Sequence, residues 1–138
     1  MRHSKRLKKI LFVCVGNTCR SQMAEGFANR YGNGKIEAMS AGTSAAGIVN
    51  GYTIDAMKEI GIDISGHTSV QLTREMIEWA DIVVTLGCSS AETLCPSSYD
   101  GKKYDWKVED PLGRPWEFMQ RVRDSIGRKV RELIDDEG

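Results

Sequence analysis

Apolar residues follow two patterns along this chain: short unbroken runs, and longer stretches in which they recur three or four positions apart. The runs at Lys9–Val13 and Asp81–Leu86 are typical of strands that are buried on both faces of a parallel sheet. Two shorter segments, Ile36–Ala41 and the region around Tyr104–Val108, predict two further strands.

Stretches with helical spacing separate these strands. They predict four helices, each with a recognisable start or end: one through Met23–Ala28 that stops at Gly32, one through Ile54–Ile60 closed by Gly61, one over Arg74–Ala80 capped by Thr73, and an amphipathic terminal helix from Pro115 to Leu133. The stretch Gly87–Asp105 has no strong period, which favours a functional or mobile loop.

Strands that alternate with helices predict a single-domain α/β fold over residues 1–138. We expect a three-layer sandwich in which a four-stranded parallel sheet carries helices on both faces. Ligands of such folds bind beyond the carboxyl ends of the strands, where the strand order reverses. Cys14 and Cys88 follow two of those ends. Residues 1–8, which hold a basic cluster, are predicted to be a flexible tail.

The balance of charge narrows the possible partners. Nineteen basic and nineteen acidic residues give a formal net charge of zero, which argues against nucleic acid as the main partner. No apolar run is long enough to span a bilayer, and no signal-peptide pattern is present. We therefore expect a cytoplasmic monomer that binds no membrane.

A cysteine-containing loop, C-V-G-N-T-C-R-S at residues 14–21, stands between the first predicted strand and the first predicted helix. Consecutive N–H groups in such a loop form a concave anion site, and the helix terminus adds positive potential. Arg20 can bind two oxygens of a tetrahedral oxyanion, and the same field favours the nucleophilic thiolate form of Cys14. The alternative is that Cys14 is a small buried apolar side chain beside an ordinary turn.

These features resemble the low-molecular-weight protein tyrosine phosphatase family and its relatives, the thioredoxin-coupled arsenate reductases. The resemblance extends over nearly the whole chain: the loop of residues 14–21, Glu25, Ser40-Ala41-Gly42, Asp63–Ser69, Asp81–Leu86, Asp110-Pro111 and the last helix. It implies a low-molecular-weight phosphatase-like fold and an enzyme that acts on arsenate or a phosphate-like oxyanion.

The resemblance also implies a role for each matching residue. Cys14 would be the nucleophile, Arg20 the oxyanion clamp, and Ser21 a hydrogen-bond donor to the thiolate. Asp110 would be the general acid that protonates the leaving oxygen, although Asp-Pro by itself is also a common turn. The oxyanion-binding loop would consist of Val15, Gly16, Asn17, Thr18, Cys19 and Arg20, with Asn17 and His67 in supporting roles.

Two further cysteines distinguish a reductase from a phosphatase. Hydrolysis of a phosphate ester needs one thiolate, whereas reduction of arsenate needs a second thiol that closes a disulfide. Cys88 and Cys95 resemble the redox pair of the reductases and imply a relay from Cys14 to Cys88 to Cys95, with thioredoxin as the reductant. The alternatives are two unrelated thiols, or a zinc site, which the lack of a Cys-x-x-Cys pair disfavours. We expect no metal and no other cofactor.

Other positions divide between the two activities. Gln22 stands where these phosphatases usually have proline, and Leu112-Gly113 replaces the aromatic pair that stacks a phosphotyrosine ring in the eukaryotic-type phosphatases. Both positions favour a reductase. Thr18 resembles the phosphoarginine phosphatases, so a tyrosine or arginine phosphatase that acts through a phosphocysteine at Cys14 is the alternative function.

Three positions depart from the reductase pattern or have no assigned role. Many of these reductases bind potassium beside the loop, and the corresponding positions here are Asn17, Glu25, Ser40 and Val70. The last of these is an aspartate in those reductases, so the ligand set is incomplete. Gly87 resembles a one-residue insertion before Cys88, and Cys19 resembles a loop thiol that can protect the nucleophile in phosphatases.

Overall fold

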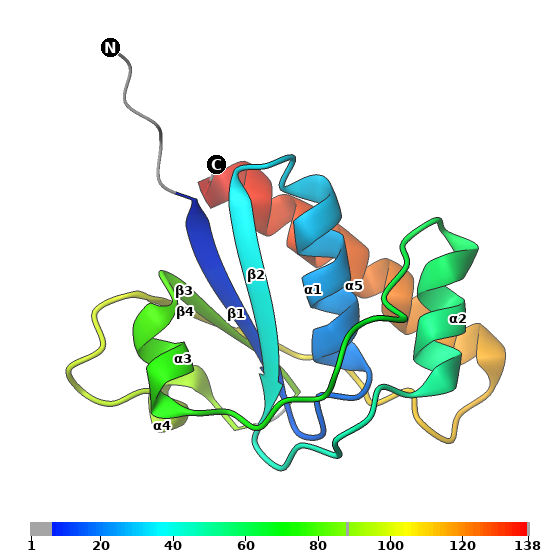
Figure 1. Cartoon of the computed structure of the whole chain (residues 1–138), viewed down its shortest axis with the longest axis horizontal. Helices are drawn as coiled ribbons and strands as arrows, with labels where there is room; N and C mark the ends of the chain where they lie inside the picture. The colour runs from blue at the N-terminus through cyan, green and yellow to red at the C-terminus, as the bar shows by residue number, and fades with distance from the viewer. Residues whose placement is uncertain (1–6, 88, 138) are drawn as a thin grey trace.

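The computed structural model describes residues 7–87 and 89–137. Its centre is a four-stranded parallel sheet in the order β2-β1-β3-β4 (Figure 1), which confirms the predicted sheet. The strands are β1 (Lys8–Cys14), β2 (Ile36–Gly42), β3 (Ile82–Leu86) and β4 (Lys102–Trp106). Lys8 was predicted to belong to a flexible tail. It is instead part of β1, where it pairs with Ile36 of β2. Backbone pairing extends past the apolar run because the ladder requires no apolar side chain.

Five helices lie in the described residues: α1 (Arg20–Tyr31), α2 (Gly51–Glu59), α3 (Arg74–Trp79), α4 (Ala91–Leu94) and α5 (Trp116–Glu137). Thr73 caps α3 as predicted, because its Oγ1 accepts a hydrogen bond from Met76 N at 3.3 Å. Only α4 was not predicted. It is a single turn inside the expected loop, and one turn shows no period. None of these helices is long and apolar enough to cross a membrane.

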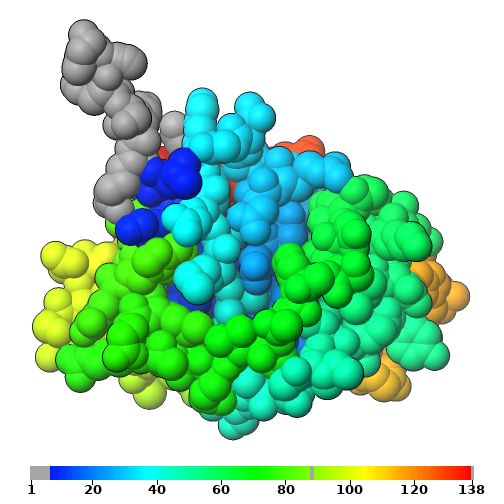
Figure 2. All heavy atoms as spheres, viewed as in Figure 1, coloured from blue at the N-terminus to red at the C-terminus, as the bar shows by residue number. Residues whose placement is uncertain are grey.

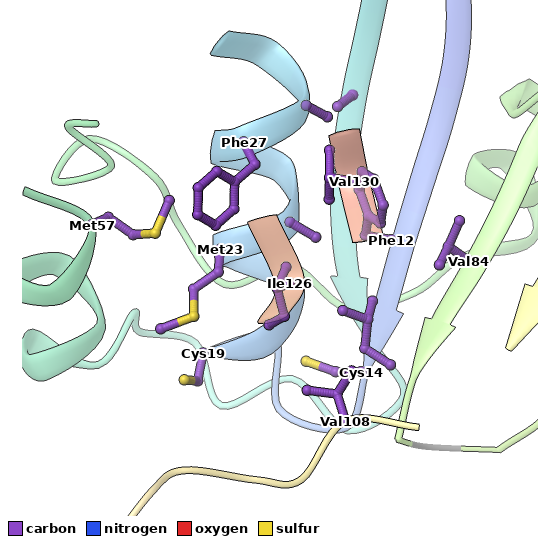
Figure 3. Close-up of a cluster of buried hydrophobic side chains, with 14 of the residues drawn as sticks. Phe12, Cys14, Cys19, Met23, Phe27, Met57, Val84, Val108, Ile126 and Val130 are labelled. Carbon is purple, nitrogen blue, oxygen red and sulfur yellow. The ribbon is translucent and has the colours of Figure 1, made fainter. Parts of the chain in front are cut away.

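Alternate residues of β1 face opposite sides of the sheet, and helices cover both sides. Ile10 and Phe12 pack in the core that the sheet shares with α1 and α5 (Figure 3). Leu11 and Val13 pack in a second core with side chains of α3 and α4. Burying each large apolar side chain stabilises the fold by about 1.5–3 kcal/mol. Burial on both faces explains why the apolar run of β1 is unbroken.

The carboxyl edge of the sheet is where the strand order reverses. β1 has β2 on one side and β3 on the other, so connections leave this edge in opposite directions. Residues 15–19, 43–50 and 107–115 follow β1, β2 and β4 at this edge, which is the lower one in Figure 1. Figure 2 shows segment 43–50 packed against the green segment before α3, and Gly47 N donates to Ser69 Oγ at 3.0 Å between them.

Candidate active site

The cysteine loop between β1 and α1 has its carbonyl oxygens engaged by surrounding groups. Hydrogen bonds of 2.9–3.0 Å reach the carbonyls of residues 14–19 from Thr43 N, Ser44 N, Ala46 N, Gln22 Nε2, Asn50 N and Met23 N. Because the carbonyls point outward to these partners, the N–H groups of the loop are left to line its inner side, as an anion-binding nest requires. Gly42 lets the loop lie close to β2, since a Cβ there would be 2.5 Å from Val15 O.

Asn17 holds the loop in a left-handed turn. Its φ is 50°, a conformation that non-glycine residues adopt mainly when side-chain hydrogen bonds support it. Its Oδ1 accepts from Val70 N at 2.8 Å, and its Nδ2 donates to Ser21 Oγ at 2.7 Å. The side chain therefore connects the loop to the segment before α3 and to the start of α1.

Ser21 and Cys14 lie together in the buried floor of this loop. The distance from Cys14 Sγ to Ser21 Oγ is 2.9 Å. Since Ser21 Oγ already accepts from Asn17, its hydroxyl proton is available to Cys14. The geometry therefore fits the predicted pairing of nucleophile and donor.

Arg20 and Asp110 meet at the mouth of the site. The Arg20 side chain is 8% exposed and the Asp110 side chain 53% exposed, with 3.9 Å between Arg20 Nη2 and Asp110 Oδ2. Arg20 Nη1 donates to Val108 O at 3.0 Å, which fixes the guanidinium. The other carboxylate oxygen of Asp110, Oδ1, accepts from Leu112 N of the same turn at 3.1 Å. A fixed cation beside an exposed carboxylate suits an oxyanion clamp with a proton donor at its rim.

Gly87 supports the clamp, a function that sequence reasoning missed. Its φ is +76°, and a Cβ there would overlap Arg20 Nη1 and lie 2.5 Å from Val108 O. The sequence does show that Gly87 immediately follows a buried strand. It does not show that Gly87 must make room for Arg20, because Arg20 is far away in the sequence. The absence of a side chain at Gly87 thus leaves the space that the Arg20 guanidinium occupies.

Gln22 joins the loop to His67 in the buried interior. Gln22 Nε2 donates to Asn17 O and to Thr68 O, both at 3.0 Å. That orientation of the amide turns Oε1 toward His67 Nδ1, 2.9 Å away. Because an amide oxygen only accepts, Nδ1 is the donor of this hydrogen bond. Gln22 therefore connects His67 to the backbone of the loop at Asn17.

The positions that resemble potassium ligands are joined by direct hydrogen bonds. Ser40 Oγ donates to Glu25 Oε1 at 2.5 Å. Burial raises the pKa of Glu25, while the hydrogen bond from Ser40 and the nearby His67 oppose that shift. The backbone N–H of Val70 occupies Asn17 Oδ1. In residues 7–87 and 89–137, no three His, Cys, Asp or Glu side chains are grouped as metal ligands.

The remaining thiols lie apart from the loop interior. Cys19 is 2% exposed, with its Sγ 3.9 Å from Met119 Sδ, and Figure 3 shows its sulfur turned away from Cys14. Burial raises the pKa of Cys19 to about 12, so it is a neutral thiol at pH 7. Cys95 is buried with the α3-side core, and burial also raises its pKa. Cys88 lies outside the described residues.

Thr18 uses its hydroxyl on the outer side of the loop. Its Oγ1 donates to Ile48 O at 2.6 Å, which helps attach the loop to segment 43–50. The residue that resembles the phosphoarginine phosphatases is therefore part of the loop's external hydrogen bonding.

Comparison with known proteins agrees with this geometry. The family model described as low molecular weight phosphotyrosine protein phosphatase matches residues 9–137, and the chain belongs to that family. Arsenate reductase 2 of Staphylococcus saprophyticus is 45% identical over 130 residues, which are 94% of this chain and 98% of the relative. Arsenate reductase 1 of Bacillus cereus is 44% identical over 129 residues, which are 93% of this chain and 95% of the relative.

Solved structures with the same fold include both kinds of enzyme. An arsenate reductase in the phosphate binding state has a TM-score of 0.81 and 39% identity, covering 94% of this chain and 98% of that one. An arginine phosphatase from Geobacillus stearothermophilus has a TM-score of 0.81 and 30% identity, covering 94% and 92%. A thioredoxin-dependent arsenate reductase from Corynebacterium glutamicum has a TM-score of 0.80 and 30% identity, covering 99% and 66%.

Proposed function

We propose that this protein is an arsenate reductase that converts arsenate to arsenite through a thiol relay. One combination carries the proposal: an oxyanion loop with Cys14 beside Arg20, and two additional thiols, Cys88 and Cys95, in the same chain. The two curated relatives that match over 93–94% of this chain are both named arsenate reductase.

The relay begins with substrate binding in the loop. The N–H groups and the Arg20 guanidinium bind the tetrahedral arsenate. The Cys14 thiolate, which Ser21 stabilises at 2.9 Å, attacks arsenic. Asp110 gives a proton to the departing oxygen, which leaves as water. The product holds arsenic(V) on the Cys14 sulfur.

Cys88 supplies the second thiolate. It attacks the Cys14 sulfur, and a disulfide forms between the two residues while the sulfur–arsenic bond breaks. The electron pair of that bond goes to arsenic, which is reduced to arsenic(III) and leaves as arsenite; the two thiols are oxidised. This step is inferred from the resemblance and from the position of Cys88 two residues after β3.

Cys95 completes the relay. Its thiolate attacks Cys88, which frees Cys14 and closes a Cys88–Cys95 disulfide for reduction by an external dithiol. Cys14 and Cys95 pack in different cores, on opposite faces of the sheet, which supports an intermediate carrier between them. A cytoplasmic protein has dithiols of the thioredoxin class available, and one solved relative is described as thioredoxin-dependent.

Phosphatase activity is the second candidate function. It needs only Cys14, Arg20 and Asp110, and two contacts support it: 3.9 Å between Arg20 Nη2 and Asp110 Oδ2, and 2.9 Å between Cys14 Sγ and Oγ of Ser21, the residue after Arg20. The fold is also that of an arginine phosphatase at 30% identity. The Thr18 hydroxyl proton is donated to Ile48 O, so its Oγ1 could contact an organic leaving group only as an acceptor.

Two assays on one preparation test the proposal. We expect multiple turnovers of arsenate with thioredoxin, its reductase and NADPH, and at most slow hydrolysis of an aryl phosphate. Cys95→Ser should stop arsenate reduction after one turnover and leave the hydrolysis unchanged, whereas Cys14→Ser should abolish both. Sustained arsenate reduction by Cys95→Ser, or rapid hydrolysis with no reduction by the wild type, contradicts the proposal.

A further inference from the structure

A second cavity lies far from the cysteine loop, between the C-terminal part of α1, the middle of α5 and the segment after α2. Its volume is about 300 Å³, within the ~300–1,000 Å³ range of small-ligand pockets. Figure 1 shows α1 and α5 side by side with α2 next to them. Arg30, which lines the cavity, is about 15 Å further along α1 than Arg20, given the rise of ~1.5 Å per residue.

Positive charge is concentrated in this cavity although the whole chain is neutral. Three guanidinium groups, those of Arg30, Arg128 and Arg131, belong to its lining. Within the described part of the chain, none of the three forms an ion pair with a carboxylate. The acidic residue of the lining, Asp124, already accepts from Arg123 Nε at 2.9 Å. Arg30 Nη2 donates to Gly61 O, so Arg128 and Arg131 are the guanidinium groups of the lining that an anion's oxygens can bind.

The remaining walls are aromatic and aliphatic. The rings of Phe27 and Tyr31 have centroids 5.5 Å apart, and Ile60 leaves 37% of its surface exposed. The Arg131 guanidinium lies over the Tyr31 ring, 4.3 Å from its centroid, which orients that cation beside the apolar wall. Gly127 lets α5 pack directly against the Phe27 ring at the base of the cavity, since a Cβ there would lie 2.9 Å from that ring.

We propose that this cavity binds a small anion with a flat aromatic body, the class that includes aromatic carboxylates and aryl phosphates. The ring would lie against Tyr31 and Ile60, and the anionic group would face Arg128 and Arg131. An inorganic anion would leave the apolar wall in water, and a neutral aromatic molecule would leave the cations without a partner. The site is independent of the chemistry at Cys14.

Calorimetric titration of the reduced full-length protein with naphthalene-2-carboxylate tests this site. Saturating inorganic phosphate keeps the cysteine loop occupied during the titration. We expect saturable binding, and at least tenfold weaker binding of the neutral naphthalene-2-carboxamide, because a charge-assisted hydrogen bond is worth about one decade of affinity. Arg128→Gln should weaken the carboxylate about tenfold.

The matched control is Arg121→Gln, which removes an exposed arginine of α5 outside the cavity and should leave affinity unchanged. Circular dichroism melting checks that each variant is folded. Three results would overturn the proposal: no saturable binding to the wild type, equal affinity for the carboxylate and the carboxamide, or equal effects of Arg128→Gln and Arg121→Gln. A fourth would be binding of the probe that is seen without phosphate and lost when phosphate is saturating, since the probe would then be bound in the cysteine loop.

Discussion

Replacing Gly87 with alanine should weaken oxyanion binding although no residue that contacts the substrate is substituted. The added Cβ would overlap Arg20 Nη1 and lie 2.5 Å from Val108 O, where ordinary contacts begin at 3.4 Å. The guanidinium and the carbonyl must therefore move by about 1 Å. Their hydrogen bond, 3.0 Å long, is the one that fixes Arg20 in the site.

The size of the effect follows from that displacement. A misplacement of about 1 Å in a catalytic group reduces turnover roughly 100-fold. The positive φ of +76° adds strain of about 1–2 kcal/mol for any L side chain, which lowers stability but not activity. Gly34→Ala separates the two contributions, because Gly34 has a φ of +79° and no atom within 4 Å of an added Cβ.

The assay is phosphate affinity by calorimetry together with kcat/KM for an aryl phosphate, which involves Cys14 and Arg20 but not the redox pair. Both glycine variants should lose unfolding free energy in urea, and Gly87→Ala should lose more, because its overlap with Arg20 and Val108 O adds to the positive-φ strain that the two share. Only Gly87→Ala should lose phosphate affinity and about 100-fold in kcat/KM. If Gly87→Ala binds phosphate within twofold of Gly34→Ala, the argument that Gly87 makes room for Arg20 is wrong.

Three further outcomes are expected. Ser21→Ala should lower kcat/KM for an aryl phosphate about tenfold, because it removes the donor 2.9 Å from Cys14 Sγ; an unchanged single-turnover rate would contradict the donor role. Arg20→Lys should lower phosphate affinity and kcat/KM about 100-fold, since lysine lacks the bidentate fork; near-normal values would exclude the clamp. Hydrogen bonds from Tyr104 and Lys102 lower the pKa of Glu137. The ionised Glu137 therefore stabilises the folded state above pH ~4.3, and this stabilisation is lost as the pH falls through the lowered pKa. Glu137→Gln should therefore destabilise by about 1–2 kcal/mol at pH 7 and by less at pH 3 in urea melts, and a pH-independent difference would refute the linkage.

Local sequence was enough to predict the sheet and the cysteine loop. The run Lys9–Val13 is unbroken because both faces of β1 are covered, and residues 14–21 form the loop within one strand-to-helix connection. The pairing of Cys14 with Ser21 was implied by the family resemblance, and both residues belong to that one connection. Short-range patterns determine such features, so they can be recognised without tertiary contacts.

The supporting contacts could not be predicted because they join distant segments. Gly87, Arg20 and Val108 meet through three different loops or helix starts, and nothing in a local pattern links them. The hydrogen bond from Gln22 to Thr68 O also joins distant segments. The sequence showed only that Gln22 stands where the phosphatases usually have proline. The single-turn helix α4 was missed because it is too short to have a period.

The thiol relay is tested most directly by mass mapping of disulfides in Cys95→Ala after reaction with arsenate and no external reductant. This variant should release one arsenite per protein and accumulate a Cys14–Cys88 disulfide, because the thiol that resolves it is absent. Wild type treated in the same way should instead contain a Cys88–Cys95 disulfide. Arsenite release with Cys14 and Cys88 both remaining as free thiols, or no arsenite at all, would contradict the reductase account.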